Sequence, residues 1–143
     1  MRAIIVDRSA PAALRLADVP EPLAGPSQVL LEVHHASLNH RDLNDARSGR
    51  VPPVVGCSGR MPPVWWPTDG SGPAAGTRVV ALTPRAFAER SAVQVGALAE
   101  VPPSVALTEA AALPVAGVAA LRALRAAGSV LGKRVVPVKR SNQ

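Results

Sequence analysis

Proline and glycine punctuation is the feature that most limits how this chain can fold. The 143 residues include 15 Pro and 11 Gly, and up to Val101 the apolar runs between them are short. Proline cannot donate a backbone hydrogen bond, and both residue types favour turns. The sequence therefore predicts many short strands joined by turns, as in a small β-barrel or sandwich.

Aliphatic and β-branched runs mark the expected strands. The clearest is Gln28–Leu38, where Val29, Leu31 and Val33 share one face because successive residues of a strand point to opposite sides. The polar stretch that follows, Asn39–Gly49, predicts a loop with a short helical turn. The other expected strands cover residues 2–6, 13–16, 77–82, 87–95 and 98–101.

The pattern becomes helical after residue 106. Leu107-Thr108 predicts an N-cap, Glu109 places an acid in the first turn, and Pro114 suits the first turn of a second helix. Gly128 is expected to end that helix. An apolar run then starts at Val135, and a helix that leads into a strand predicts the start of an α/β unit. One helical stripe indicates core packing or domain docking: Val118, Leu121 and Leu124.

Composition excludes several classes of protein. Cys57 is the single cysteine, so neither an intrachain disulfide framework nor a cysteine-rich zinc site is expected. The N-terminus reaches charged residues at once and no apolar run looks long enough for a membrane span, which predicts a cytoplasmic protein. The net charge of +6 leaves nucleic-acid binding open, although only 2% of the residues are aromatic and the basic residues are scattered.

Several sequence motifs, in their order and spacing along the chain, indicate a protein family. The most specific are Asn39-x-x-Asp42 followed by Arg47-Ser48-Gly49, and the AAALPVAG run at 110–117. MRAIIV, GPSQVLLEVHHASLNHRDL and FAERSAV accompany them. Over most of residues 1–50 and 77–136 the chain thereby resembles the N-terminal, GroES-like domain of medium-chain dehydrogenases/reductases. The most similar branch is the zinc-free quinone oxidoreductases and their alcohol-dehydrogenase-like relatives.

The resemblance implies a mainly β fold with C-terminal helices. A GroES-like barrel is expected at residues 1–127, with an irregular segment at 51–75. In relatives a Rossmann domain follows and holds NADP(H), and later segments complete the barrel. Residues 128–143 would then be the remnant of the start of that Rossmann domain, which this chain is expected to lack.

The sequence departs from the family pattern in two places. Pro137 interrupts what should be a central strand, and no glycine follows to approach a pyrophosphate. Within residues 55–70 only Gly56 is kept of the expected elements. The family pattern is thus lost, regained and lost again along the chain, which predicts paired shifts of reading frame in the coding DNA. The resulting fragment is expected to be inactive alone.

Asn39 is the candidate catalytic residue. It stands where zinc-dependent relatives carry a cysteine ligand, and asparagine is a poor zinc ligand, so no zinc is expected. The resemblance implies that its amide meets the nicotinamide and donates a hydrogen bond to the substrate carbonyl as negative charge develops there. The alternative is that Asn39 only caps the turn at the end of the strand.

Asp42 and Arg47 are the other candidate cofactor-binding residues. Asp42 could orient the loop that meets the cofactor, or could serve as a local cap or as a partner for Arg41 or Arg47. Arg47 could approach a cofactor phosphate or carboxamide, or could simply be solvated. His40, next to Asn39, is a candidate proton relay.

Other residues that often mark sites give weaker indications. His34 and His35 are neighbours on a strand, so they point to opposite faces and cannot chelate one metal ion together. Cys57 has no nearby base and is expected to be an incidental thiol. Trp65-Trp66 falls in the irregular segment and is expected to be exposed.

The function implied by the resemblance is NAD(P)H-dependent reduction of a quinone, enone or carbonyl by hydride transfer. Intact relatives act on such small molecules as homodimers, and no membrane partner is expected. Two alternatives stay open. One is a non-catalytic GroES-like module that docks another subunit through an uncovered apolar surface, and the other is a basic nucleic-acid-binding protein.

Overall fold

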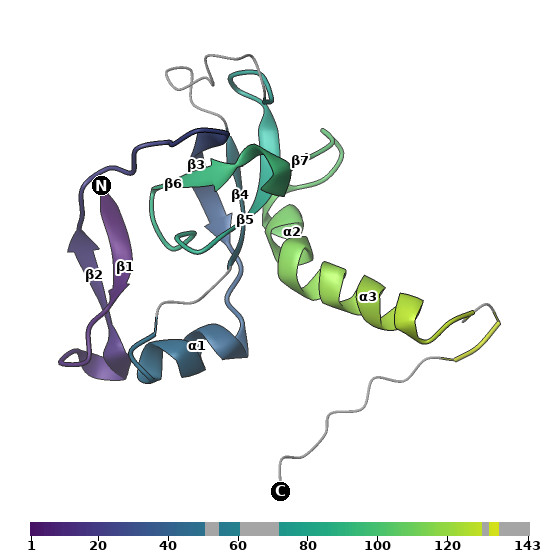
Figure 1. Cartoon of the computed structure of the whole chain (residues 1–143), viewed down its shortest axis with the longest axis horizontal. Helices are drawn as coiled ribbons and strands as arrows, with labels where there is room; N and C mark the ends of the chain where they lie inside the picture. The colour runs from purple at the N-terminus through teal and green to yellow at the C-terminus, as the bar shows by residue number, and fades with distance from the viewer. Residues whose placement is uncertain (51–54, 61–71, 130–131, 135–143) are drawn as a thin grey trace, which may run out of the picture.

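The structure is a computed structural model that describes residues 1–50, 55–60, 72–129 and 132–134 (Figure 1). It is mainly β, with a curled sheet, a separate hairpin, one short helix beside the hairpin, and a long helical segment that leads away from the sheet (Figure 1). No Rossmann domain is present among these residues. The expected fold class is confirmed.

Five strands form the sheet, in the order β6-β3-β4-β5-β7, and every neighbouring pair is antiparallel. Their bounds are β3 Gln28–Ala36, β4 Val55–Arg60, β5 Arg78–Thr83, β6 Arg90–Gln94 and β7 Leu98–Glu100. The main core cluster lies on one face of this sheet: Val29, Leu31, Cys57, Val79, Ala81, Ala86 and Val93. The shared face predicted for Val29, Leu31 and Val33 is confirmed, because all three belong to this cluster or pack against it. Leu30, on the other face, is also buried, at 2% exposed, so burial does not alternate along this part of β3.

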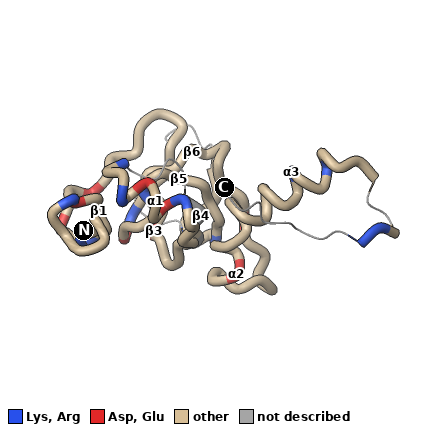
Figure 2. Tube along the Cα trace, turned by 90° about the horizontal axis from the view of Figure 1, so that it is seen from below, with Lys and Arg blue, Asp and Glu red and all other residues tan. Residues whose placement is uncertain are grey.

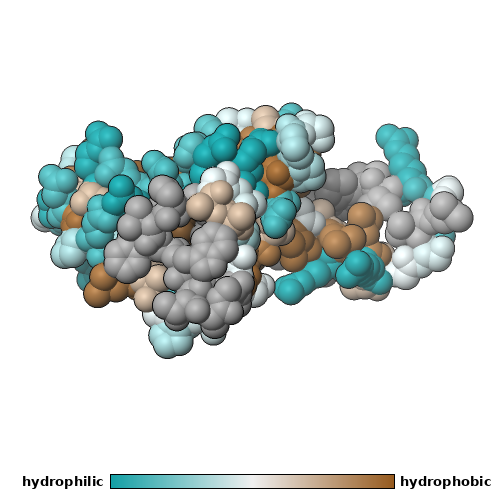
Figure 3. All heavy atoms as spheres, turned by 90° about the horizontal axis from the view of Figure 1, so that it is seen from above, coloured by the Kyte–Doolittle hydropathy of each residue, from teal (hydrophilic) through white to brown (hydrophobic). Residues whose placement is uncertain are grey.

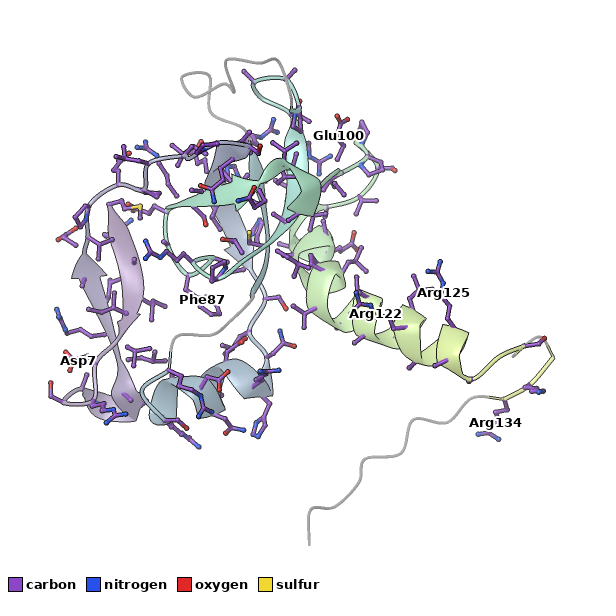
Figure 4. All side chains as sticks on the ribbon, in the orientation of Figure 1. Asp7, Phe87, Glu100, Arg122, Arg125 and Arg134 are labelled. Atoms are coloured by element: carbon purple, nitrogen blue, oxygen red, sulfur yellow. The ribbon has the colours of Figure 1, made fainter. Side chains whose placement is uncertain are left out.

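The hairpin pairs β1 (Arg2–Val6) with β2 (Leu14–Asp18), and the short 3₁₀ helix η1 (Pro11–Ala13) lies in its turn. A bridge between Ala3 and Ala88 ties the hairpin to the segment before β6. The Ile4 N–H also donates to the Phe87 carbonyl at 2.8 Å. Phe87 lies between the hairpin and the sheet (Figure 4).

A helical segment of three parts follows the short 3₁₀ helix η2 (Val95–Ala97) and β7. These parts are α2 (Leu107–Ala112), the π-helical η3 (Leu113–Gly117) and α3 (Val118–Ala126). Ala110, Ala111 and Pro114 are buried, whereas no residue of α3 is buried. Gly128 has φ of 74° and follows the end of α3, as the sequence predicts.

The apolar side chains of α3 are uncovered in the described structure. Leu121 is 47% exposed, and Val118 and Leu124 are each 38% exposed. Figure 3 shows apolar surface along this helix, next to hydrophilic side chains. The stripe therefore does not pack in the core of this domain, which leaves docking as the remaining interpretation.

The helical segment also corrects one expectation. Leu107–Ala126 is long and apolar enough to cross a membrane, judged by length and composition alone, and 17% of its most apolar window is buried. The expectation that no apolar run approaches that length was wrong. One such helix is weak evidence for a span, because core helices of soluble proteins meet the same criteria.

The irregular segment expected at 51–75 contains regular structure. β4 lies inside it and pairs with both β3 and β5, so this stretch crosses the middle of the sheet. The strand was not predicted because its middle residues are small and lack the β-branched pattern typical of strands: Gly56, Cys57, Ser58 and Gly59. Trp65, Trp66 and Pro137 lie outside the described residues.

Two helix boundaries also differ from expectation. Residues expected to form a loop with a single helical turn instead form α1 (His40–Arg47), an eight-residue helix. The N-cap of α2 is Ala106, one residue before the expected Leu107, and the Glu109 carboxylate accepts the Ala106 N–H at 3.2 Å. This hydrogen bond is the half of a capping box in which the side chain at the third helical position accepts the N-cap N–H.

Candidate functional site

Helix α1 carries the three predicted site residues at its two ends. Asn39 is the N-cap, in extended conformation, and marks the point where the chain leaves β3. The Oδ2 atom of Asp42 accepts the Asn39 backbone N–H at 2.7 Å. An acid in the first turn also interacts favourably with the helix dipole. Asn39 and Asp42 are therefore brought together, and the capping roles considered for both residues are confirmed.

The backbone of Asn39 is held within the capping box of α1. The residue is half-buried, and two hydrogen bonds join its backbone to Asp42: its N–H donates to the carboxylate, and its carbonyl accepts the Asp42 N–H at 3.0 Å. Both bonds fix the backbone from which the side chain projects. A fixed amide donor suits an oxygen on which negative charge develops.

Arg47 is separated from this pair by the length of the helix. Seven intervals of about 1.5 Å place its Cα roughly 10 Å along the axis from that of His40. Arg47 is exposed and makes no ion pair among the described residues. The structure thus does not bring Arg47 into contact with Asn39, and the solvated interpretation of Arg47 fits its present position.

Asp45 is a residue of this region that the sequence reasoning missed. It is 5% exposed and pairs with Arg50 at 2.8 Å and with Arg41 at 3.4 Å. Its carbonyl also accepts the Arg50 N–H at 2.8 Å. Arg41 is therefore a partner of Asp45 and not of Asp42. The i,i+4 spacing of Arg41 and Asp45 was the available signal.

The hydrogen bond from Arg50 lowers the pKa of Asp45, with attraction to Arg50 and Arg41 adding to it and partial burial opposing it. A carboxyl whose pKa is lower in the folded chain stabilises the fold above its unfolded pKa of about 3.9. That contribution is lost as the pH falls through the lower, folded-state pKa. Asp45 thus fastens the turn after α1 at neutral pH.

We expect Asp45→Asn to lower the melting temperature at pH 7, because it removes the charge that both arginines share. The difference from the unmodified chain should shrink as the pH falls below about 4. Thermal unfolding followed by circular dichroism between pH 7 and pH 3 measures both effects. Glu100→Gln is a matched control on an exposed carboxylate of β7. A difference for Asp45→Asn that stays constant into acid would contradict this role.

The end of α1 is also fastened to the hairpin. The Arg8 guanidinium donates to the Ser48 carbonyl at 2.9 Å. Gly49 has φ of 71°, a conformation that side chains other than glycine rarely adopt, and the Arg8 side chain lies directly against it. The Arg47-Ser48-Gly49 motif therefore contains at least one residue whose type is set by local backbone geometry.

A large cavity lies between the hairpin, α1 and the loop before β6. Its volume is about 830 Å³. Most of the walls are apolar, with side chains from β1, from the segment after β2 and from α1. Asp42 lines it, whereas Asn39 does not. Of the two residues in the capping box, only Asp42 therefore contacts the cavity.

The histidines form no cluster in the described part of the chain. His34 is exposed and His35 is half-buried, as expected for neighbours on opposite faces, and their ring centroids are 6.5 Å apart. His40 is exposed at the first position of α1. Among the residues that the structure describes, no three His, Cys, Asp or Glu side chains gather as a metal site would require.

Cys57 is a core residue. It is fully buried in the sheet, and burial raises the pKa of its thiol to about 12. A thiol with this pKa is almost wholly protonated at neutral pH and is a poor nucleophile. The sequence predicts an incidental thiol at Cys57, but it does not predict that Cys57 lies in the core.

Charge on the surface is mixed. Figure 2 shows Lys and Arg spread along the described chain, and several of these side chains alternate with Asp and Glu around the hairpin and α1. Within the described residues, five arginines pair with carboxylates: Arg2, Arg15, Arg41, Arg50 and Arg90. A continuous basic stripe of the kind that tracks a nucleic-acid backbone is not seen on the described residues.

Comparison with solved structures identifies the fold. The chain matches the quinone oxidoreductase from Coxiella burnetii with 27% identity and a TM-score of 0.78, over 89% of this chain and 45% of that one. It matches the quinone oxidoreductase from Thermus thermophilus, also solved as a complex with NADPH, with 32% identity and a TM-score of 0.69, over 89% and 41%. The chain has the GroES-like fold of the medium-chain dehydrogenases/reductases. The resemblance seen in the sequence is confirmed.

Other comparisons fit this family. The human synaptic vesicle membrane protein VAT-1 homolog-like protein matches with 26% identity and a TM-score of 0.78, over 89% of this chain and 43% of that one. No protein-family model matches the sequence, and no curated protein matches it either. This GroES-like chain spans less than half the length of each solved relative named above.

Proposed function

We propose that this chain is the N-terminal, substrate-side domain of an NAD(P)H-dependent oxidoreductase that reduces a quinone, enone or carbonyl. The observation that carries the proposal is the placement of Asn39. The residue caps a helix at the end of the longest strand, and its backbone is held by Asp42 at 2.7 Å. The solved structures similar to this chain include quinone oxidoreductases.

In this proposal Asn39 binds and orients the substrate. Its carboxamide N–H donates to the carbonyl oxygen, and the bond strengthens as negative charge develops on that oxygen. The capping bond to Asp42 limits motion of the donor, so little reorganisation is needed during the reaction. NADP(H), when bound, supplies the hydride.

The described residues fit only the substrate side of such a site. A dinucleotide pyrophosphate is held by backbone N–H groups of a glycine-rich turn at a helix N-terminus. The described part of the chain offers no such turn at the start of α1 or α2, which begin at His40 and Leu107. We therefore assign no step to the cofactor here, and propose that the 143-residue chain alone has no turnover.

The domain limits are part of the proposal. Residues 1–127 form the GroES-like unit, and residues 128–143 correspond to the start of a Rossmann domain. The exposure of α3, whose apolar side chains are uncovered, supports a neighbour that packs there. A cytoplasmic homodimer acting on a small molecule, without zinc, is the proposed state of the intact enzyme.

A chimeric enzyme tests the function. Residues 1–127 of this chain would replace the corresponding part of the Thermus thermophilus quinone oxidoreductase. We expect NADPH-dependent reduction of 1,4-benzoquinone by the chimera, and a loss of about 10²- to 10³-fold in kcat on Asn39→Ala, the usual effect of removing a donor to a developing oxyanion. Initial rates of NADPH oxidation give the result.

Asn44→Ala in the same chimera is the matched control, because Asn44 is an exposed asparagine of α1 and its truncation should change kcat far less. A chimera that folds and binds NADPH but is inactive would contradict the proposal. Unchanged kcat for Asn39→Ala would contradict the role of Asn39 specifically.

A second candidate is a non-catalytic module that docks another protein subunit. The exposed stripe of α3 favours it, since exposed apolar patches on soluble domains often mark interfaces. Two measurements together separate this candidate from the first. One is the activity of the chimera, and the other is light scattering of the purified chain, which reports whether it assembles with another subunit. An inactive chimera together with a stable complex with another subunit would favour the docking module.

A further inference from the structure

The cavity between the hairpin, α1 and the loop before β6 has a carboxylate oxygen of Asp42 in its wall that takes no part in the helix cap. Asp42 is 5% exposed and lies in the cavity wall. Its Oδ2 atom accepts the Asn39 N–H. Among the described residues no hydrogen-bond donor reaches its Oδ1 atom. No buried side-chain oxygen among these residues lacks a partner, so Oδ1 is open to the cavity, where it is an available acceptor.

The rest of the cavity is suited to an apolar molecule. Its volume of about 830 Å³ lies in the range of about 300–1,000 Å³ typical of small-molecule sites. The walls include Ile4, Ile5 and Val6 of β1, Leu14 of β2, and Leu38 and Leu43 on either side of Asn39 in the chain. Ile4 and Leu38 are 48% and 60% exposed, so apolar surface is open to an occupant.

The other charged groups that line the cavity do not neutralise Asp42. Glu21 forms an ion pair with Arg90. The Met1 ammonium donates to the Val19 carbonyl at 3.0 Å. Arg85 is exposed at the edge, where solvent screens its charge. Of the described charged groups in the wall, the Asp42 carboxylate is the most buried.

We infer that this cavity binds a hydrophobic amine, with the apolar body against β1 and α1 and the protonated nitrogen on Oδ1 of Asp42. Ammonium is a hydrogen-bond donor without an acceptor, which matches a carboxylate oxygen in an apolar wall. A quinone or ketone offers only acceptor oxygens to this position. The amine would use Oδ1 of Asp42 while Oδ2 keeps the Asn39 N–H, so this site lies beside the proposed one at Asn39 and is distinct from it.

Three ligands with one apolar body test the inference on the full 143-residue chain: 4-phenylbutylamine, 4-phenylbutan-1-ol and 4-phenylbutanoate. We expect the amine to bind at least about tenfold more tightly than the carboxylate, with the alcohol between them. Titration calorimetry gives the affinities. Methyl NMR locates the site, because Ile4, Ile5, Leu14 and Leu43 should shift while Leu121 and Leu124 should not.

Asp42→Asn should reduce the affinity for the amine about tenfold and leave that for the alcohol nearly unchanged. Asparagine retains an oxygen that accepts the Asn39 N–H, so the helix cap is kept. Arg85→Ala should preserve the preference for the amine. The comparison of the three ligands on the unmodified chain needs no variant, so it holds even if Asp42→Asn does not fold.

Three results would overturn the inference. One is equal binding of amine and carboxylate, and another is a set of methyl shifts confined to α3. The third is no binding of any ligand up to its solubility limit, which is the result expected if a segment of polypeptide is the natural occupant. Failure here would leave the chimera experiment unaffected, because that experiment depends on Asn39.

Discussion

Gly59→Ala is expected to lower the melting temperature by about 10 °C, the shift that a loss of about 3 kcal/mol gives in a chain of this size. A Cβ at residue 59 would overlap the Glu32 carbonyl oxygen and lie 3.2 Å from the Val33 Cα. Both are backbone atoms of β3, so the clash is relieved only if the β3–β4 ladder separates. These two strands are central in the sheet.

Thermal unfolding by circular dichroism measures this effect, with Gly96→Ala as the matched control. Gly96 lies in η2, and a Cβ there meets no atom within 4 Å. The control should shift the melting temperature by no more than a few degrees. Equal stability of the two variants would show that β4 does not pair with β3 as described.

Leu31→Ala is expected to destabilise the chain by about 2–5 kcal/mol, the usual cost of removing a buried leucine side chain. Leu31 is 0% exposed and is the largest of the fully buried side chains among the described residues. It packs in the core cluster with Val29, Cys57 and Val79. The chain contains few aromatic residues that could fill the space, so the loss should fall toward the upper part of this range.

Urea unfolding of Leu31→Ala gives the free energy directly, and Leu16→Ala is the matched control. Leu16 is 63% exposed on β2, so its truncation should cost less than about 1 kcal/mol. A loss for Leu31→Ala no larger than that for Leu16→Ala would contradict the assignment of the core to this face of the sheet.

The sequence predicted most strands because their alternation is strong. β3 has apolar residues at every second position, and β1, β5 and β7 were expected close to their observed bounds. β4 could not be predicted, since a central strand made largely of Gly, Ser and Cys depends on its neighbours for pairing. Tertiary pairing supplies what local propensity lacks.

The candidate site was predicted in part. The contact between Asn39 and Asp42 follows from capping, which acts over three residues and can be recognised in sequence. The cavity beside Asp42 could not be foreseen, because β1, α1 and the 84–88 loop meet only in the folded chain. The same is true of Asp45, whose stronger partner, Arg50, lies beyond the end of the helix.

The central claim is that this chain supplies the substrate side of an oxidoreductase and needs a cofactor domain for turnover. Titration of the full 143-residue chain with NADPH, followed by the nucleotide's fluorescence, tests it most directly. We predict no saturable change up to millimolar protein, and no NADPH oxidation when 1,4-benzoquinone is added. Saturable binding in the micromolar range, or quinone-dependent oxidation by the chain alone, would contradict the claim.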